Sequence, residues 1–333
     1  MKQQEEWKIS VPWGKLVLSR WGDPKGLPVL LVHGRQDSCS VFKPLLDMMP
    51  DTYNYVALDM PGNGLSDPFP LGPKLMRFHF LAAMEFAVEH LGWDQFIFIG
   101  HSMGCEQGLF FNVVHPNRIT KMVLLDPGPT LIRMQIEDPV EYQKAFYDSY
   151  YENYHRENFT RKTYTRYSAL QAIKKARDLT DQQGMDLLER NFHESTSTRE
   201  TPNEAGPPGE AQTQELGQTV KHMPDNEVEG YLSWDYRLRS LAPQNYGNKY
   251  YFQLFKTIPP TLVVAASHGT KNASRNLEHH RNAKELMEKM SKLENYYQVN
   301  VEGSHDVHYT HPERVVSHVI QFLSDNLKKN SKL

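Results

Sequence analysis

A serine between two glycines is the residue whose setting points most directly to chemistry. Residues 98–104 read Phe-Ile-Gly-His-Ser-Met-Gly, so Ser102 lies in a G-x-S-x-G pattern between an apolar run and a helical pattern. Gly100 and Gly104 permit a tight turn from strand to helix, because a side chain at either place would crowd the backbone. The turn exposes the hydroxyl at a helix N-terminus, which favours developing negative charge. We expect Ser102 to be a nucleophile; a structural serine is the alternative.

A late histidine is the candidate base. The segment 301–305 reads Val-Glu-Gly-Ser-His and places His305 between an apolar run and a helical pattern, where a triad histidine follows its serine and acid. His305 would take the Ser102 proton and return it to the leaving group. His308 and His311 continue a spacing of three residues, which is also a zinc-like pattern. Three imidazoles on a loop rarely converge without a Cys or carboxylate partner. We therefore expect no metal, no cofactor, and a structural or helix-capping His308.

The acid of the triad is missing from its commonest position. After the apolar run at 261–266 the chain reads Ser-His-Gly-Thr-Lys-Asn-Ala, and the next carboxylate is Glu278. The apolar run before it, at 122–125, is followed by Asp126. A carboxylate there would point off the carboxyl end of a strand, on the active-site side of the sheet. We expect Asp126 to be the acid; capping or bracing the entrance to the following segment is its alternative role.

Two backbone amides could stabilise an oxyanion. One belongs to Met103, the residue after the serine, and the other to the loop that follows His33-Gly34, which we assign to Arg35. Removing one such donor typically lowers the rate by ~10²–10³. The position of this dipeptide after the apolar run at 29–32 supports the assignment. An ordinary turn glycine is the alternative for Gly34.

Short apolar runs alternate with helical patterns at both ends of the chain, which predicts parallel crossovers and an α/β fold. The later runs are continuously apolar, as is typical of strands buried on both faces of a parallel sheet. We expect strands at 16–18, 28–32, 55–58, 96–99, 122–125, 261–265 and 296–301, and helices at 74–91, 103–114, 277–292 and from about Thr310 onward. Thr310 and Glu313 match a capping box, with Pro312 in the first turn.

A different kind of sequence interrupts this alternation. Residues 127–257 are polar, aromatic and mostly helical in period, so we expect a helical cap inserted in a core made of 1–126 and 258–333. Within the cap, 195–221 has almost no large apolar residues and cannot offset the entropy of ordering. We expect a flexible excursion there; a lid loop that orders on ligand binding is the alternative.

Composition excludes several classes of partner. The formal net charge is −3, so no strong field steers the protein toward nucleic acid or acidic membranes. The chain has two cysteines, Cys39 and Cys105, whereas a secreted protein of this size would often carry several pairs. Residues 1–10 lack the apolar core of a signal peptide, and no run approaches the ~20 apolar residues that span a bilayer. We expect a soluble protein.

The last three residues, Ser331, Lys332 and Leu333, match an address read by the peroxisomal import receptor. The polar stretch Lys-Lys-Asn precedes them and should leave them exposed. We expect that receptor as a partner and a peroxisomal location, with some cytoplasmic protein also allowed. A chance ending of a basic tail is the alternative.

Together these motifs resemble those of the α/β-hydrolases. LLVHG at 30–34, ALDMPGNGLSD at 57–67, GHSMG at 100–104 and GSH at 303–305 come in the order and spacing of that family. The chain also resembles the narrower serine hydrolase-like group, a peroxisome-associated branch, at VPWG (11–14), KMVLLD (121–126) and EGSHDVHYTHPERV (302–315). The resemblance implies a mostly parallel central sheet flanked by helices, with a cap after the sixth core strand and Ser102 as nucleophile. Arg35 departs from the aromatic or aliphatic residue often found there.

The expected reaction is hydrolysis of an ester or thioester through an acyl-enzyme on Ser102. The aromatic side chains of the cap favour a small apolar acyl or aryl substrate. A binding protein that keeps the fold but has little or no turnover is the alternative from another class, motivated by the missing acid. A lyase or perhydrolase that uses the same triad is a third reading.

Overall fold

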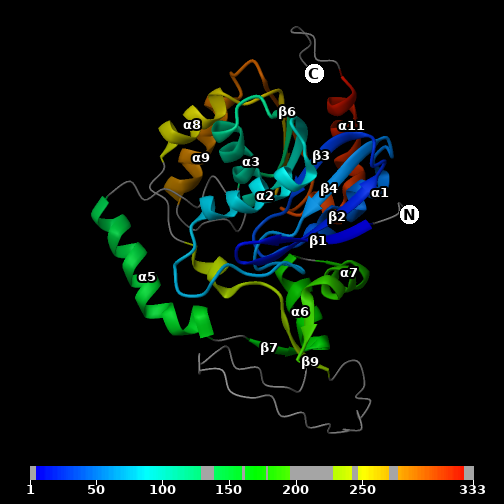
Figure 1. Ribbon diagram of the computed structural model, residues 1–333. Coiled ribbons are helices and arrows are strands. Elements are labelled where there is room, and N and C mark those ends of the chain that lie inside the picture. The colour runs from blue at the N-terminus through cyan, green and yellow to red at the C-terminus, as the bar shows by residue number, and fades with distance from the viewer. Residues whose placement is uncertain are drawn as a thin grey trace. The chain divides into compact units, whose positions relative to one another are not determined.

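The computed structural model describes residues 5–128, 139–159, 162–177, 179–195, 228–241, 247–269 and 277–325 (Figure 1). The chain divides into two compact units, one of residues 1–160 with 233–333 and the other of Arg161–Leu232. The second unit follows the sixth strand of the main sheet along the chain. It is shorter than the predicted cap at 127–257, whose boundaries stay a prediction. Of the predicted flexible segment 195–221, all but Ser195 lies outside the described residues.

An eight-stranded sheet forms the centre of the larger unit. The first strand pairs antiparallel with the second, and the second pairs antiparallel with the next strand across the sheet. All other neighbouring strands pair parallel. In order across the sheet, the strands are β1 (Glu5–Val11), β2 (Gly14–Gly22), β4 (Tyr53–Leu58), β3 (Leu27–Val32), β5 (Phe96–His101), β6 (Ile119–Leu125), β10 (Thr261–Ala266) and β11 (Tyr296–Val301). The expected α/β class with a mostly parallel sheet is confirmed.

Helices cover both faces of this sheet. Figure 1 shows α2, α3, α8 and α9 on one side and α1 and α11 on the other. Their bounds are α1 (Lys43–Met48), α2 (Leu81–Leu91), α3 (Met103–Val114), α8 (Asn248–Lys256), α9 (Leu277–Met290) and α11 (Val316–Ser324). This unit also contains the long helix α5 (Pro139–Phe159) and the short helix α10 (Val307–Thr310). Its described 3₁₀ turns are η1 (Cys39–Phe42), η2 (Arg77–Phe80), η4 (Tyr236–Ser240) and η5 (Pro312–Arg314).

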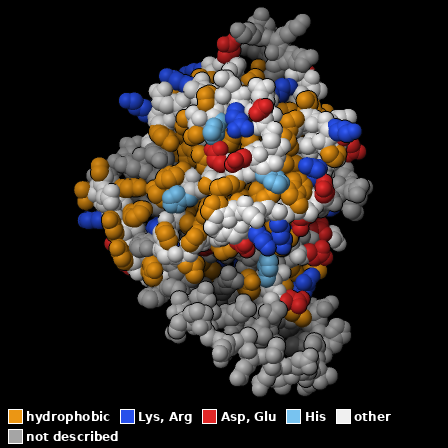
Figure 2. All heavy atoms as spheres, viewed as in Figure 1, with side chains coloured by type: hydrophobic (Ala, Val, Ile, Leu, Met, Phe, Trp, Pro, Cys, Tyr) orange, Lys and Arg blue, Asp and Glu red, His pale blue; other side chains and the backbone are white. Residues whose placement is uncertain are grey.

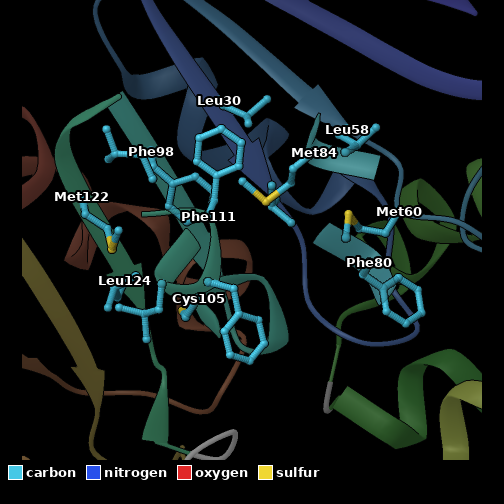
Figure 3. Close-up of a cluster of buried hydrophobic side chains, with 14 of the residues drawn as sticks. Leu30, Leu58, Met60, Phe80, Met84, Phe98, Cys105, Phe111, Met122 and Leu124 are labelled. Atoms are coloured by element: carbon cyan, nitrogen blue, oxygen red, sulfur yellow. The ribbon is translucent and has the colours of Figure 1, made fainter. Parts of the chain in front are cut away.

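The apolar runs identified in the sequence make the core. The side chains labelled in Figure 3 come from both layers: Leu30, Leu58, Phe98, Met122 and Leu124 from the strands, and Met84, Cys105 and Phe111 from α2 and α3. These eight residues are fully or almost fully buried. Runs of this kind fit strands that are covered by helices on both faces. The carboxyl ends of β3, β5, β6 and β11, which carry the candidate site, are thereby held on a rigid base.

Two expectations about elements need correction. β1 was not expected, since its residues alternate in exposure and only Ile9 is buried, so it lacks the continuous apolar signal of the inner strands. The capping box at Thr310 was wrong. Thr310 is the last residue of α10, and its hydroxyl donates to the Asp306 carbonyl at 3.2 Å instead of capping the next helix. The regular final helix, α11, begins only at Val316.

The smaller unit combines helices with a second sheet. Its helices are α6 (Arg166–Arg177) and α7 (Asp181–Asn191), and its three short strands β7 (Thr163–Thr165), β9 (Glu229–Leu232) and β8 (Phe192–Glu194) pair antiparallel in that order. Thr180 caps α7, because its side chain accepts from Gln183 N–H while the Gln183 side chain accepts from Thr180 N–H. The expectation of a mostly helical segment missed this small sheet.

The surface carries both signs of charge. On the face seen in Figure 2, lysines and arginines lie among aspartates and glutamates. This interspersion agrees with the small net charge of −3. In the described part of the chain, every helix is too short or too polar to cross a bilayer.

Candidate active site

Ser102 lies in a strained turn between β5 and α3. Its backbone has φ 53° and ψ −118°, a conformation that non-glycine residues rarely adopt. The turn is held on both sides, because Ser102 N–H donates to Leu125 O at 3.1 Å and Ser102 O accepts from Cys105 N–H at 3.0 Å. A Cβ on Gly104 would lie 2.1 Å from the Val32 carbonyl oxygen. The glycine of the motif therefore permits α3 to approach β3 and hold the turn.

The loop after β3 lies directly against this serine. A Cβ built on Gly34 would be 3.0 Å from the Ser102 Cβ. Arg35 follows Gly34, and Met103 supplies the first amide of α3, a position whose donor has no partner within the helix. The two segments that carry the predicted oxyanion amides are thus adjacent at the serine. The assignment of those two amides stays a prediction.

An Asp–His pair lies beyond the ends of two other strands of this sheet: Asp126 follows β6, and His305 follows β11. His305 Nδ1 and Asp126 Oδ2 are 2.6 Å apart, and Ala266 N–H donates to Asp126 Oδ1 at 3.1 Å. Asp126 is only 3% exposed, whereas the His305 side chain is 29% exposed. An ionised carboxylate can only accept, so the Nδ1 atom carries the proton and Nε2 keeps its lone pair. That tautomer is the one a general base needs.

The geometry explains how β6 supplies this carboxylate. Leu125, the residue before Asp126, pairs with Val264 of β10, so Asp126 lies beside the strand end that lacks an acid. A Cβ on Gly269 would be 2.0 Å from Asp126 Oδ2. The described part of the loop after β10 therefore leaves room for a carboxylate that enters from the adjacent strand. Asp126 has a φ of 46°, so its backbone too is in a conformation unusual for a residue with a side chain.

The ring of His101 connects the serine turn to the loop that carries His305. His101, which precedes Ser102, has its Nε2 3.2 Å from the His305 carbonyl oxygen, and the two rings have centroids 4.7 Å apart. The Ser102 hydroxyl itself makes no hydrogen bond with any of the described residues. Hydrogen bonds of catalytic groups are often long without substrate and tighten in the complex. The structure thus places Ser102, Asp126 and His305 at the carboxyl ends of β5, β6 and β11.

The rings of the three late histidines make different contacts. The His305 ring bonds Asp126, the buried His308 ring packs against His101 with centroids 4.1 Å apart, and the exposed His311 pairs with Glu313 at 3.2 Å.

A different polar cluster was missed in the sequence. Asp37, His101 and Asp306 are all buried, and each offers an atom within 4.8 Å of the others. Their positions are 64 and 205 residues apart along the chain, which hides the cluster from motif reasoning.

The Arg35 side chain has a role that the sequence only hinted at. Its guanidinium donates to the carbonyls of Leu238 at 3.3 Å and Arg239 at 3.5 Å, both in η4. The buried Arg237 holds the same turn, because it pairs with Asp235 at 2.6 Å and donates to the Phe69 and Pro70 carbonyls. Arg35 therefore links the loop beside Ser102 to a firmly anchored turn.

Cys105 lies behind the serine and is not a second nucleophile. Burial raises the pKa of its thiol well above the usual value, and the Asp126 charge raises it further. Its Sγ donates to the Gly100 carbonyl at 3.2 Å. A thiol kept protonated in this way is chemically inert.

A strained serine at a strand-to-helix turn, with an Asp–His pair at the carboxyl ends of other strands of the same mostly parallel sheet, defines an α/β hydrolase. Comparison with known proteins agrees. The family described as alpha/beta hydrolase fold matches residues 27–312, and the chain belongs to that family.

Relatives with the serine hydrolase-like name are similar to this chain, which confirms the resemblance noted in the sequence. Serine hydrolase-like protein 2 of Homo sapiens is 26% identical over 96% of this chain and 93% of its own length. Serine hydrolase-like protein of Danio rerio is 35% identical over 57% of this chain, and that match spans only 58% of the relative's length. Among solved structures, a hypothetical protein of Pseudomonas aeruginosa PAO1 superposes with a TM-score of 0.75 at 19% identity, covering 96% of this chain and all of that one (100%).

Proposed function

We propose that this hydrolase cleaves an ester or thioester of a small apolar acyl or aryl compound through an acyl-enzyme on Ser102. The observation that carries the proposal is the 2.6 Å contact between His305 and Asp126 beside the strained Ser102. This pair keeps the Nε2 lone pair available for a proton, which an unassisted serine hydroxyl cannot give up at neutral pH.

The reaction follows a double displacement. His305 Nε2 takes the Ser102 proton as the oxygen attacks the substrate carbonyl, and the amides of Met103 and Arg35 bind the oxyanion that forms. His305 then gives the proton to the leaving alcohol or thiol as the carbon–oxygen or carbon–sulfur bond breaks. Water, deprotonated by the same ring, attacks the acyl-enzyme and restores Ser102. Asp126 orients the ring and stabilises the imidazolium that appears in each half.

Aromatic side chains on α5 support the proposal of an apolar substrate. Along α5 the half-buried rings of Tyr142 and Phe146 have centroids 6.4 Å apart. The helix contacts η4, the turn that Arg35 holds. Apolar and aromatic linings are typical of pockets for small organic ligands.

An activity screen tests the proposal. Wild type and Ser102→Ala are assayed against p-nitrophenyl esters and acyl thioesters of graded acyl length. We expect turnover by wild type that rises to an optimum length and disappears in Ser102→Ala. Hydrolysis that persists in Ser102→Ala would refute Ser102 as the nucleophile. Its loss, together with a transient acyl adduct on Ser102 of wild type in rapid-quench mass spectrometry, would support the two-step path.

The second candidate function is a ligand-binding protein with little turnover. It is favoured by the Ser102 hydroxyl, which makes no hydrogen bond to His305 among the described residues. A folded wild type that binds apolar esters without hydrolysing any member of the screen would select this function over catalysis.

We also propose that the protein enters peroxisomes through Ser331, Lys332 and Leu333, which lie outside the described residues. A terminal S-K-L is an address recognised by the import receptor.

A further inference from the structure

A buried cluster of ionisable side chains lies beside the proposed base. Asp37 follows β3, His101 is the last residue of β5, and Asp306 precedes α10. Their exposed fractions are 1%, 2% and 8%, and one polar atom of each lies within 4.8 Å of the others. Buried carboxylates are costly unless charge or hydrogen bonds compensate them, so such a cluster needs a physical role.

The contacts of His101 fix where its proton lies. Its Nε2 is 3.2 Å from the His305 carbonyl oxygen, and an amide carbonyl can only accept. The same Nε2 is 4.0 Å from Asp306 Oδ1, whose negative charge also favours a proton on the facing nitrogen. Both neighbours therefore select the tautomer or ion in which Nε2 is protonated.

The bond joins two parts of the site that are distant in the chain. His101 directly precedes Ser102 in the chain, and its ring donates to the backbone carbonyl of His305, the proposed base. The rings of His305 and His308 pack on it with centroids 4.7 and 4.1 Å away. A shift of the 303–306 loop would therefore have to break this bond.

We propose that His101 is a positioning residue, which holds the His305 loop at a fixed distance from Ser102 through an Nε2–H bond to the His305 carbonyl, with the Asp306 carboxylate keeping Nε2 protonated. The role rests on the proposed function, since it matters for catalysis only if His305 serves Ser102. A small misplacement of a catalytic base can lower the rate by ~10².

A divalent cation is the competing occupant of the same cluster. His and Asp are common ligands of transition metals. A metal on Nε2 would replace the proton, so metal binding and the proposed hydrogen bond exclude each other.

Nitrogen NMR of the ¹⁵N-histidine-labelled protein tests the bond without any need for turnover. The His101 signals are assigned by comparison with His101→Gln. We expect a protonated Nε2 at neutral pH, unchanged by stoichiometric Zn²⁺ or Mn²⁺. A deprotonated Nε2, or metal that displaces the proton at stoichiometric concentration, would overturn the proposal even if the protein proves to be an active hydrolase.

Kinetics of three variants test the positioning role. His101→Leu removes the donor, and we expect kcat to fall by about 10- to 100-fold with KM nearly unchanged, the range that loss of one buried hydrogen bond produces. His101→Gln places an amide N–H at a similar reach and should recover most of kcat. His308→Leu is the matched control, because it removes an adjacent buried ring without removing the bond, and it should stay close to wild type.

The outcomes are distinguishable. Unchanged kcat in a folded His101→Leu, or an equal loss in His308→Leu, would show that ring packing and not the hydrogen bond matters. If His101→Leu fails to fold, the NMR spectrum of wild type tests whether His101 Nε2 is protonated. The kcat of His101→Gln then tests whether an N–H donor at this position is sufficient for catalysis. Absence of turnover in wild type with a protonated His101 Nε2 would count against the proposed function alone.

Discussion

Asp126 approaches His305 from the strand beside the one that most often supplies a triad acid. The sequence located it because β6 ends there, and the end of a parallel strand on the active-site edge is a place that pattern alone can identify. The reason that it fits, the space over Gly269, appears only in three dimensions. The same holds for His101, whose motif position was known but whose partners Asp37 and Asp306 were not.

Replacement of the acid gives the first prediction. Asp126→Asn preserves size but removes the charge that holds His305 in the base tautomer. We expect kcat to fall by about 10³–10⁴ while KM changes little. Steady-state kinetics on the preferred ester measure it, with the exposed Asp94→Asn as control. Near-normal kcat in a folded Asp126→Asn would show that another carboxylate serves as the acid.

At the scale of elements, the inner strands were predictable and the edges were not. β3, β4, β5 and β6 are nearly continuous apolar runs, so burial on both faces can be recognised from composition. β1 alternates, and the break between α10 and α11 depends on the backbone at His311 (φ −141°, ψ 59°), which no residue type demands. The η4 turn was not predictable for a different reason, because Arg237 and Arg35 hold it through contacts between residues far apart in the chain.

The link between Arg35 and η4 gives the second prediction. Arg35→Met keeps the aliphatic stem but removes the bonds to the Leu238 and Arg239 carbonyls, so the loop that carries the proposed oxyanion amide loses its tie. We expect kcat/KM to fall by about 3- to 10-fold, in line with loss of partly exposed hydrogen bonds. Arg35→Lys retains one donor and should lie between the two. Equal kcat/KM in all three proteins would show that the link does not set the loop.

At the scale of the whole molecule, a buried polar network joins three elements of the larger unit. Arg77 of η2 and Glu106 of α3 form an ion pair at 3.0 Å, and Tyr251 of α8 donates to the same carboxylate at 3.1 Å. Burial raises the pKa of Glu106 above its ordinary value of 4.5, and the Arg77 charge opposes that rise. Breaking such a pair by removing one partner is costly, because the other charge stays buried.

Stability as a function of pH gives the third prediction. Arg77→Met should lower the free energy of unfolding by about 3–5 kcal/mol at neutral pH. In this variant the folded protein keeps the Glu106 proton that the unfolded chain releases, so stability should be lost as pH rises above about 4.5. Urea unfolding across this pH range measures it. The double variant Arg77→Met/Glu106→Gln should lose that slope, and an identical slope in both would assign it to other groups.

Targeting gives the fourth prediction. Deletion of Leu333 from an N-terminally tagged chain should change punctate peroxisomal fluorescence to a diffuse distribution, because the import receptor reads the complete tripeptide. An Asn330→Ala variant, which leaves the tripeptide intact, is the matched control and should stay punctate. Punctate staining that survives the deletion would refute the address.

The most direct test of the account is labelling by a fluorophosphonate, followed by mass spectrometry of the intact protein and of its peptides. A serine activated by His305 and Asp126 should form one adduct, on Ser102, in wild type and none in Ser102→Ala, with slower labelling in Asp126→Asn. A folded wild type that stays unlabelled, or an adduct that maps to another residue, would contradict the central claim.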